Sequence, residues 1–283
     1  MSIDIKQAKN ILIKYYKKQL QKLLDNNFPE EDVKFLKVKF RHSFDCYNIG
    51  KKILESDDEL KNKSNIFKQR AELSFILHDV GRFFELTDEL NSKSHGIYGA
   101  ELLEKFENID DKLVLIAIGH HDESNIFLDN NKNYLSLTNE EKKQSIELLK
   151  VLKDADKISN LYLFKNKNTI YTRKDKKYGF SKEYFDGIEN KHLIDKKYKN
   201  TIFDSIAYYI IWYHELFYNS SQEFVRKNKL IEHLVNMYDF FIKDIEKSEL
   251  EHNSKEKVAK EKIEMENNLN KIKDILKRQN IIA

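Results

Sequence analysis

Apolar residues in this chain recur mostly at steps of three and four, which is the spacing of one face of an α-helix. A single proline and seven glycines in 283 residues leave few positions that interrupt helices. The pattern predicts an all-α protein, and Pro29 separates its first two helices. Helices are predicted at about residues 4–27, 31–55, 65–81, 95–107, 111–121, 139–163, 201–218 and 222–246.

Two polar stretches lack this periodicity. Residues 125–139 and 165–200 are rich in Asn, Lys, Asp and Tyr, and we predict long loops or broken helices there. Long loops in a compact domain are often lids or walls of a functional site, although plain connections are the alternative.

The C-terminal residues from about Lys247 are almost uniformly charged, yet a thin apolar stripe runs through them. Such a stripe is typical of a helix that packs on one partner surface, and a solvated tail is the alternative. The stripe consists of Val258, Met265, Leu269, Ile272 and Leu276, followed by Ile281 and Ile282. We therefore divide the chain into a main domain (1–200), a helical extension packing on it (201–246) and a charged helix or tail (247–283). The C-terminal helices are the candidate surface for a homo-oligomer.

Charge and cysteine content narrow the functional classes. Fifty Lys and Arg against 47 Asp and Glu give a formal charge of +3, with both signs interleaved, which argues against general nucleic-acid binding. The single cysteine, Cys46, cannot form an internal disulfide and suits a reducing compartment. The first residues do not form a secretory signal, and no apolar run reaches the roughly 18 residues of a membrane span. We expect a cytoplasmic protein without a membrane partner.

Histidines are concentrated in one part of the chain. Five of the nine fall between positions 42 and 121, and the sharpest motif is His78-Asp79, which follows an apolar run and precedes Gly81. Neutral imidazoles and ionised carboxylates are natural ligands for divalent metals, and one carboxylate can bridge two ions. Asp154 and Asp156 stand in a strongly apolar helix, where a buried acid must be paired or ligating. A metal site is therefore predicted.

The order of these motifs resembles the four-ligand signature of the HD superfamily of metal-dependent phosphohydrolases. His42, then His78-Asp79, then Asp156 match the signature in order and approximate spacing, and the similarity covers about residues 36–163. Asp156 is preferred over Asp154 because the ligand of the family follows an alanine and precedes Lys or Arg. The resemblance implies an HD-domain helical bundle, here with additional C-terminal helices.

Two further motifs resemble those of the binuclear members of this family. They are Ser94-His95-Gly96, followed by Gly99-Ala100, and Gly119-His120-His121. The resemblance implies two divalent ions of Mn, Fe, Ni, Co or Zn, bridged by Asp79. The first ion would be held by His42, His78, Asp79 and Asp156. The second would be held by Asp79, His95 and His120, His121 or both.

The resemblance implies hydrolysis of a phosphoester or phosphoanhydride of a nucleotide or another small phosphate ester by a metal-activated water. Asp79 would then be catalytic, with Arg82 and Lys157 as contacts for phosphate oxygens, and structural ion pairs are the alternative for both cations. The chain after His121 lacks the Gly-Tyr-Pro motif of the cyclic di-GMP branch, which disfavours that substrate. Two other functions stay open: an HD-type di-iron oxygenase, and a non-catalytic, metal-stabilised helical protein that acts through interactions.

Overall fold

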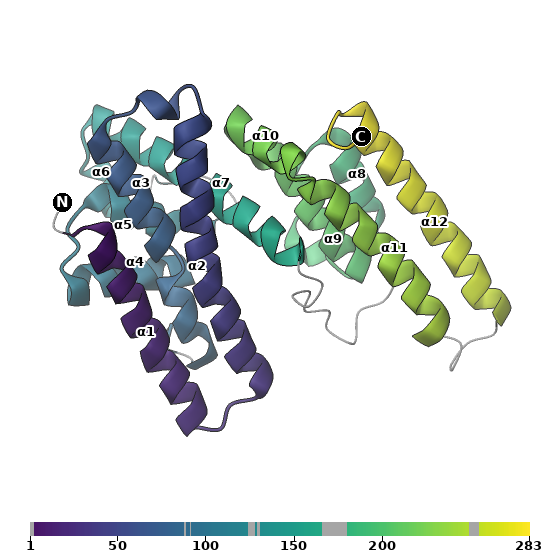
Figure 1. The fold of residues 1–283 in the computed structure, drawn as a ribbon, viewed down its shortest axis with the longest axis horizontal. Helices are drawn as coiled ribbons and strands as arrows, with labels where there is room; N and C mark the ends of the chain where they lie inside the picture. The colour runs from purple at the N-terminus through teal and green to yellow at the C-terminus, as the bar shows by residue number, and fades with distance from the viewer. Residues whose placement is uncertain are drawn as a thin grey trace. The chain divides into compact units, whose positions relative to one another are not determined.

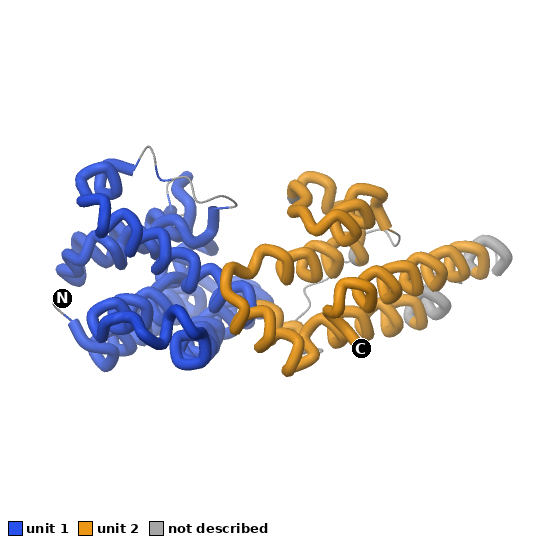
Figure 2. The backbone as a smooth tube through the Cα atoms, turned by 90° about the horizontal axis from the view of Figure 1, so that it is seen from above, with its two compact units in different colours: residues 1–159 blue, residues 160–283 orange. Residues whose placement is uncertain are grey.

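The structure is a computed structural model that describes residues 3–87, 89–90, 92–123, 128, 131–165, 180–248 and 255–283. The chain forms two compact units, residues 1–159 and residues 160–283 (Figure 2). Within the described residues every regular element is helical, which confirms the predicted all-α class. No helix in these ranges is both long enough and apolar enough to cross a membrane.

The described residues of the first unit form six complete helices and the larger part of a seventh (Figure 1). The helices are α1 (Ile5–Asp25), α2 (Glu30–Ser56), α3 (Asn65–Leu77), α4 (His95–Glu107), α5 (Lys112–His120), α6 (Lys132–Leu135) and α7 (Asn139–Lys165). Two 3-10 helices, Leu60–Asn62 and Val80–Thr87, complete it. Its core is formed by fully buried side chains that include Leu36, Phe75, Ile118 and Leu148.

Polar caps fix where these helices begin. The Asp4 carboxylate accepts from the Gln7 amide, and the Gln7 side chain accepts in turn from the Asp4 amide, which forms a capping box. The hydroxyl of Ser94 accepts from the amide of Ile97, so α4 begins with His95 as its first residue. The carboxylate of Asp111 caps α5 in the same way.

The helix predicted at 65–81 is too long, because α3 ends at Leu77 and the chain continues as a 3-10 helix from Val80. Successive side chains of an α-helix point about 100° apart, so His78 and Asp79 could not face the same point within one. The irregular turn between the two helices lets both side chains enter the core.

The second unit consists of α8 (Lys182–Asn190), α9 (Ile202–Ile211), α10 (Asn219–Lys227), α11 (Leu230–Ser248) and α12 (Lys255–Arg278), with 3-10 helices at Lys196–Tyr198 and Trp212–Glu215. Its core includes Phe203 and Tyr238, whose rings stack with centroids 5.2 Å apart. The Tyr238 hydroxyl donates to the carbonyl of Phe203 at 2.9 Å, which satisfies a buried polar group.

Helix α8 lies within the stretch 165–200, for which long loops or broken helices were predicted and of which residues 166–179 fall outside the described residues. Two other expectations for this unit were wrong in detail. The helix predicted at 201–218 ends at Ile211 and continues as a 3-10 helix. The helix predicted at 222–246 is two helices, because Lys229 adopts a φ of 51° and breaks the α-helical path.

The charged C-terminal residues form the packed helix α12 rather than a solvated tail. Its apolar stripe is buried against α11 and α8, and α12 lies beside α11 in Figure 1. The buried stripe consists of Met265, Leu269, Ile272 and Leu276, and Ile281 is buried beyond the helix end. The side chain of Val258 lies outside those that the structure describes.

Candidate metal centre

Six of the predicted ligands come together in the interior of the first unit, although they belong to five separate parts of the chain. They are His42 on α2, His78 and Asp79 after α3, His95 at the start of α4, His121 just beyond α5, and Asp156 on α7. All except Asp156 are buried, and the Asp156 side chain is partly exposed.

The first group of side chains surrounds one oxygen of Asp156. The Nε2 atom of His42 lies 2.8 Å from Asp156 Oδ1, and the Nε2 atom of His78 lies 3.4 Å from the same oxygen. The Oδ2 atom of Asp79 is 3.6 Å from His42 Nε2 and 3.7 Å from His78 Nε2. His42, His78 and Asp156 therefore bring ligand-type atoms close enough to hold one metal ion, and Asp79 Oδ2 lies beside both imidazoles.

The second group surrounds the other oxygen of Asp79. The Oδ1 atom lies 3.3 Å from His95 Nε2 and 3.4 Å from His121 Nε2, and these two nitrogens are 3.2 Å apart. Asp79 thus directs one carboxylate oxygen to each group. This is the geometry of a carboxylate that can bridge two cations.

The outward-facing nitrogens of three histidines are held by acceptors. His78 Nδ1 lies 2.9 Å from the carbonyl of Phe75, and His121 Nδ1 lies 2.7 Å from that of Ile118. His42 Nδ1 lies 3.0 Å from the hydroxyl of Ser159, which donates its own hydrogen to a main-chain carbonyl. Because each Nδ1 must donate, the lone pair of each Nε2 points into the cluster, as a metal ligand requires.

His95 is oriented by two carboxylates. Its Nδ1 atom lies 3.2 Å from Asp122 Oδ2 and 3.4 Å from Glu85 Oε1. Glu85, Asp122 and Ser159 were not predicted from the sequence. Only Ser159 carried a signal, since it stands three residues after Asp156 on the same helix face.

Two cations flank Asp79. The Nζ atom of Lys39 lies 3.4 Å from Asp79 Oδ2, and Arg82 Nε lies 3.6 Å from Asp79 Oδ1. Arg82 also donates from Nη1 to Glu85 Oε1 at 2.9 Å. Lys39 was missed, although it lies one helical turn before His42 on the same face of α2. Lys157 follows Asp156 on α7 and is half-buried.

Burial and charge set the protonation states. Burial alone would raise the pKa of Asp79, but the nearby charges of Lys39, His78 and Arg82 hold it well below its usual range. Burial lowers the pKa of His42 to about 4 and also lowers that of His121. Burial would lower the pKa of His78 as well, but the nearby Cys46 and Asp79 raise it well above its usual value in the metal-free cluster.

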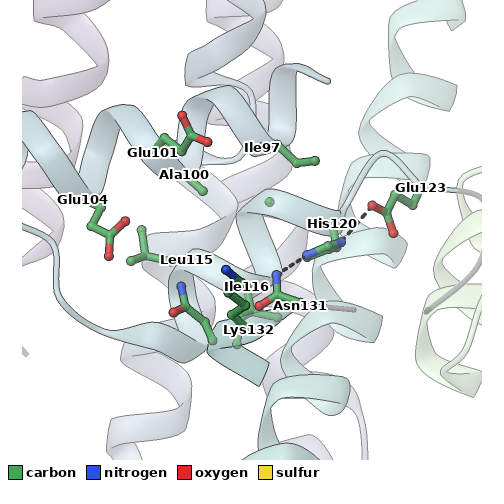
Figure 3. A pocket seen from close by; sticks show the side chains of 12 residues that line it. Ile97, Ala100, Glu101, Glu104, Leu115, Ile116, His120, Glu123, Asn131 and Lys132 are labelled. Atoms are coloured by element: carbon green, nitrogen blue, oxygen red, sulfur yellow. Dashed lines mark hydrogen bonds and ion pairs between the residues drawn. The ribbon is translucent and has the colours of Figure 1, made fainter. Parts of the chain in front are cut away.

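His120 lies away from the cluster. Its Nδ1 atom donates to Glu123 Oε1 at 2.8 Å, and the side-chain amide of Asn131 donates to its Nε2 atom at 2.6 Å. Both ring nitrogens are therefore occupied within a cavity of about 640 Å³ between α4, α5 and α6, which Glu101 and Leu115 also line (Figure 3). Of the two adjacent histidines, it is His121 that the structure brings to Asp79.

The residues of the cluster fit a divalent metal. Asp79 Oδ2 is buried without a hydrogen-bond donor, which is rare for a carboxylate oxygen. The same atom faces the Nε2 atoms of His42 and His78, and four imidazoles with two carboxylates are a donor set suited to borderline divalent ions. A cation between these atoms would satisfy the oxygen and the nitrogen lone pairs together.

An all-α unit with an interior cluster of histidines and aspartates defines the class as a helical domain that could hold metal ions. Residues 40–161 match the family model of the HD domain. The match begins two residues before His42 and ends five residues after Asp156, so it encloses the whole cluster. Comparisons with curated proteins and with solved structures gave no match.

Proposed function

We propose that this protein is a metal-dependent phosphohydrolase that uses two divalent ions to cleave a phosphoester or phosphoanhydride bond of a nucleotide or another small phosphate ester. The observation that carries the proposal is the position of Asp79, whose two oxygens face two separate groups of imidazoles. The HD domain supports it, since this superfamily consists mostly of metal-dependent hydrolases.

The ligand sets follow from the two groups. His42, His78, Asp79 and Asp156 hold the first ion in this proposal, and Asp79, His95 and His121 hold the second. Of the adjacent histidines, we assign His121 and not His120 to the second ion, because both ring nitrogens of His120 are engaged by Glu123 and Asn131.

Bound metal ions would supply an activated water and neutralise charge on the phosphoryl oxygens. The chain contributes the orientation of the imidazoles, through the acceptors that hold each Nδ1 atom, and the positive charge around the centre. Lys39, Arg82 and Lys157 are the proposed contacts for the remaining phosphate oxygens. Lys39 has the ammonium nearest to Asp79, whereas Arg82 already binds Glu85 and must share its guanidinium with the substrate.

A substrate screen tests the proposal. Purified protein is stripped with a chelator, reloaded with Mn, Fe, Ni or Co, and assayed for phosphate release from nucleotides, cyclic dinucleotides and sugar phosphates. We expect turnover without dioxygen, and a loss of at least about 10³-fold in Asp79→Asn, because both groups of ligands share this carboxylate. Asp110→Asn, an exposed aspartate of the same unit, is the matched control and should retain full activity.

The proposal fails if no phosphate ester is cleaved with any of these metals, or if Asp79→Asn remains as active as Asp110→Asn. Turnover that requires both iron and dioxygen would instead support the oxygenase alternative.

A further inference from the structure

A buried lysine lies against the turn that follows α5. The Lys153 side chain on α7 is only 5% exposed. Its ammonium group donates to the carbonyl of His121 at 3.1 Å and also to the carbonyl of Glu123. The two hydrogen bonds hold the first and last residues of the three-residue turn His121–Glu123.

This turn carries two parts of the second group of ligands. His121 directs Nε2 to Asp79, and the next residue, Asp122, places its carboxylate 3.2 Å from the Nδ1 atom of His95. A shift of the turn would therefore move the imidazole of His121 directly and release that of His95 from one of its two acceptors. The turn reaches the first group through His121, which lies 3.4 Å from Asp79 Oδ1 and packs edge-on against the ring of His78. His42 and Asp156 take no part in these contacts.

The chemistry of the contact favours a charged group at position 153. Burying an ammonium is costly unless strong acceptors surround it. The carbonyls just beyond α5 carry the negative end of that helix. Burial and the charge of Lys157 lower the pKa of Lys153 to about 8, and the carboxylates of Asp156 and Asp122 partly offset that lowering. A side chain that served only to fill space would not require a cation here.

Lys153 lies on the same face of α7 as the candidate ligand Asp156. It precedes Asp156 by three residues, so both side chains leave the same face of the helix. One face of α7 thus supplies a ligand of the first group and holds the turn that carries the second.

We propose that Lys153 is a positioning residue that fixes the His121–Glu123 turn and thereby sets the geometry of the second metal site, formed by Asp79, His95 and His121. The proposal rests on the two-metal function proposed above. It requires the effect of Lys153 to be selective: the second site depends on it and the first site does not.

Manganese binding to the full chain tests this selectivity. Chelator-stripped wild type, Lys153→Met and the matched control Lys143→Met, an exposed lysine of the same helix, are titrated with Mn²⁺ by calorimetry and electron paramagnetic resonance. We expect two Mn²⁺ ions with an exchange-coupled spectrum in the wild type and the control. In Lys153→Met we expect one tight ion with an uncoupled signal, and an affinity for the second ion lowered about 10- to 100-fold.

Equal weakening of both sites would show a merely structural role and overturn the proposal, as would two wild-type affinities in Lys153→Met. Should Lys153→Met fail to fold by circular dichroism, Lys153→Gln, which keeps one amide donor, is judged by the same criteria. A wild type that binds fewer than two ions overturns both this inference and the two-metal function. Coupled Mn²⁺ in both the wild type and Lys153→Met overturns the role of Lys153 alone.

Discussion

His42 is fully buried, and the lowered pKa of its imidazole, about 4, links the stability of the metal-free protein to pH. Between pH 6.5 and pH 4 the unfolded chain binds a proton at His42 that the folded chain does not. The free energy of unfolding therefore falls as the pH is lowered through this window. We predict a loss of roughly 2 kcal/mol from this residue between pH 7 and pH 5.

Urea unfolding in the presence of a chelator at both pH values measures this loss. The comparison is with His42→Asn, which cannot titrate and should lose about 2 kcal/mol less than the wild type between the two pH values. His192→Asn, at an exposed position, should behave as the wild type does. An identical pH dependence in His42→Asn and the wild type would contradict the prediction.

Individual residues also show what a sequence can and cannot reveal about the site. His42, His78, Asp79, His95 and Asp156 could be found because they stand in motifs whose order is recognisable. The choice between His120 and His121 could not be made, since it depends on where the helix α5 ends and on contacts from Asn131. Lys39 and Asp122 were missed because a single charged residue looks the same whether it faces solvent or a cluster.

The 3-10 helix that begins at Val80 packs so closely against α4 that a methyl group cannot fit between their backbones. A Cβ at Gly81 would overlap the carbonyl oxygen of His95 and lie 2.8 Å from the amide nitrogen of Gly99. We predict that Gly81→Ala destabilises the first unit by about 3 kcal/mol, because backbone rather than a flexible side chain must move. It should also weaken metal binding, because His95 shifts with its carbonyl.

Gly119→Ala is the matched control for this prediction. A Cβ at Gly119 would meet only the Cβ of Ala100, at an ordinary distance of 3.6 Å. This variant should be as stable as the wild type or up to about 1 kcal/mol more stable, because alanine favours a helix. Thermal melts measure the stability of both variants, and Mn²⁺ titrations measure their metal affinity. Equal effects of Gly81→Ala and Gly119→Ala would contradict the prediction.

Helix α12 allows a similar comparison of two isoleucines. Ile272 is fully buried, whereas Ile263 is 58% exposed. We predict that Ile272→Ala destabilises the second unit by about 2 to 5 kcal/mol, because it leaves a cavity, and that Ile263→Ala costs less than about 0.5 kcal/mol. Hydrogen exchange of the α11 and α12 amides measures both, and similar values for the two variants would argue against the packed position of α12.

The helices differ in how well their positions could be predicted from the sequence. Long helices with a regular apolar face, such as α1 and α2, could be predicted to within a few residues. Helix α8 lies in a stretch predicted to be loops or broken helices, and its position could not be given because it is only nine residues long and buries only Tyr184, Gly187 and Ile188 between polar positions. The break at Lys229 was hidden because the apolar spacing continues across it, and only the backbone conformation interrupts the helix.

At the scale of the whole chain, the residues divide into two compact units, and the candidate ligands all lie in residues 1–159. A ligand that binds only the folded state stabilises it by about 2.7 kcal/mol at a hundredfold excess over its dissociation constant. We predict that Mn²⁺ at this excess slows hydrogen exchange in the cores of α2, α3 and α5 about a hundredfold. Exchange in α11 and α12 should not change.

Mass-spectrometric hydrogen exchange with and without Mn²⁺ measures this difference, and Mg²⁺ at the same concentration controls for ionic strength. Equal protection of α12 would show that the two units open together.

The five parts of the chain that form the cluster also determine when it can form during synthesis. His42, His78, Asp79, His95 and His121 leave the ribosome before Asp156, and Ser159, which holds the ring of His42, comes later still. A nascent chain therefore has one group of ligands complete while the other still lacks Asp156. The cluster is completed only when α7 has been made, while the second unit is still being translated.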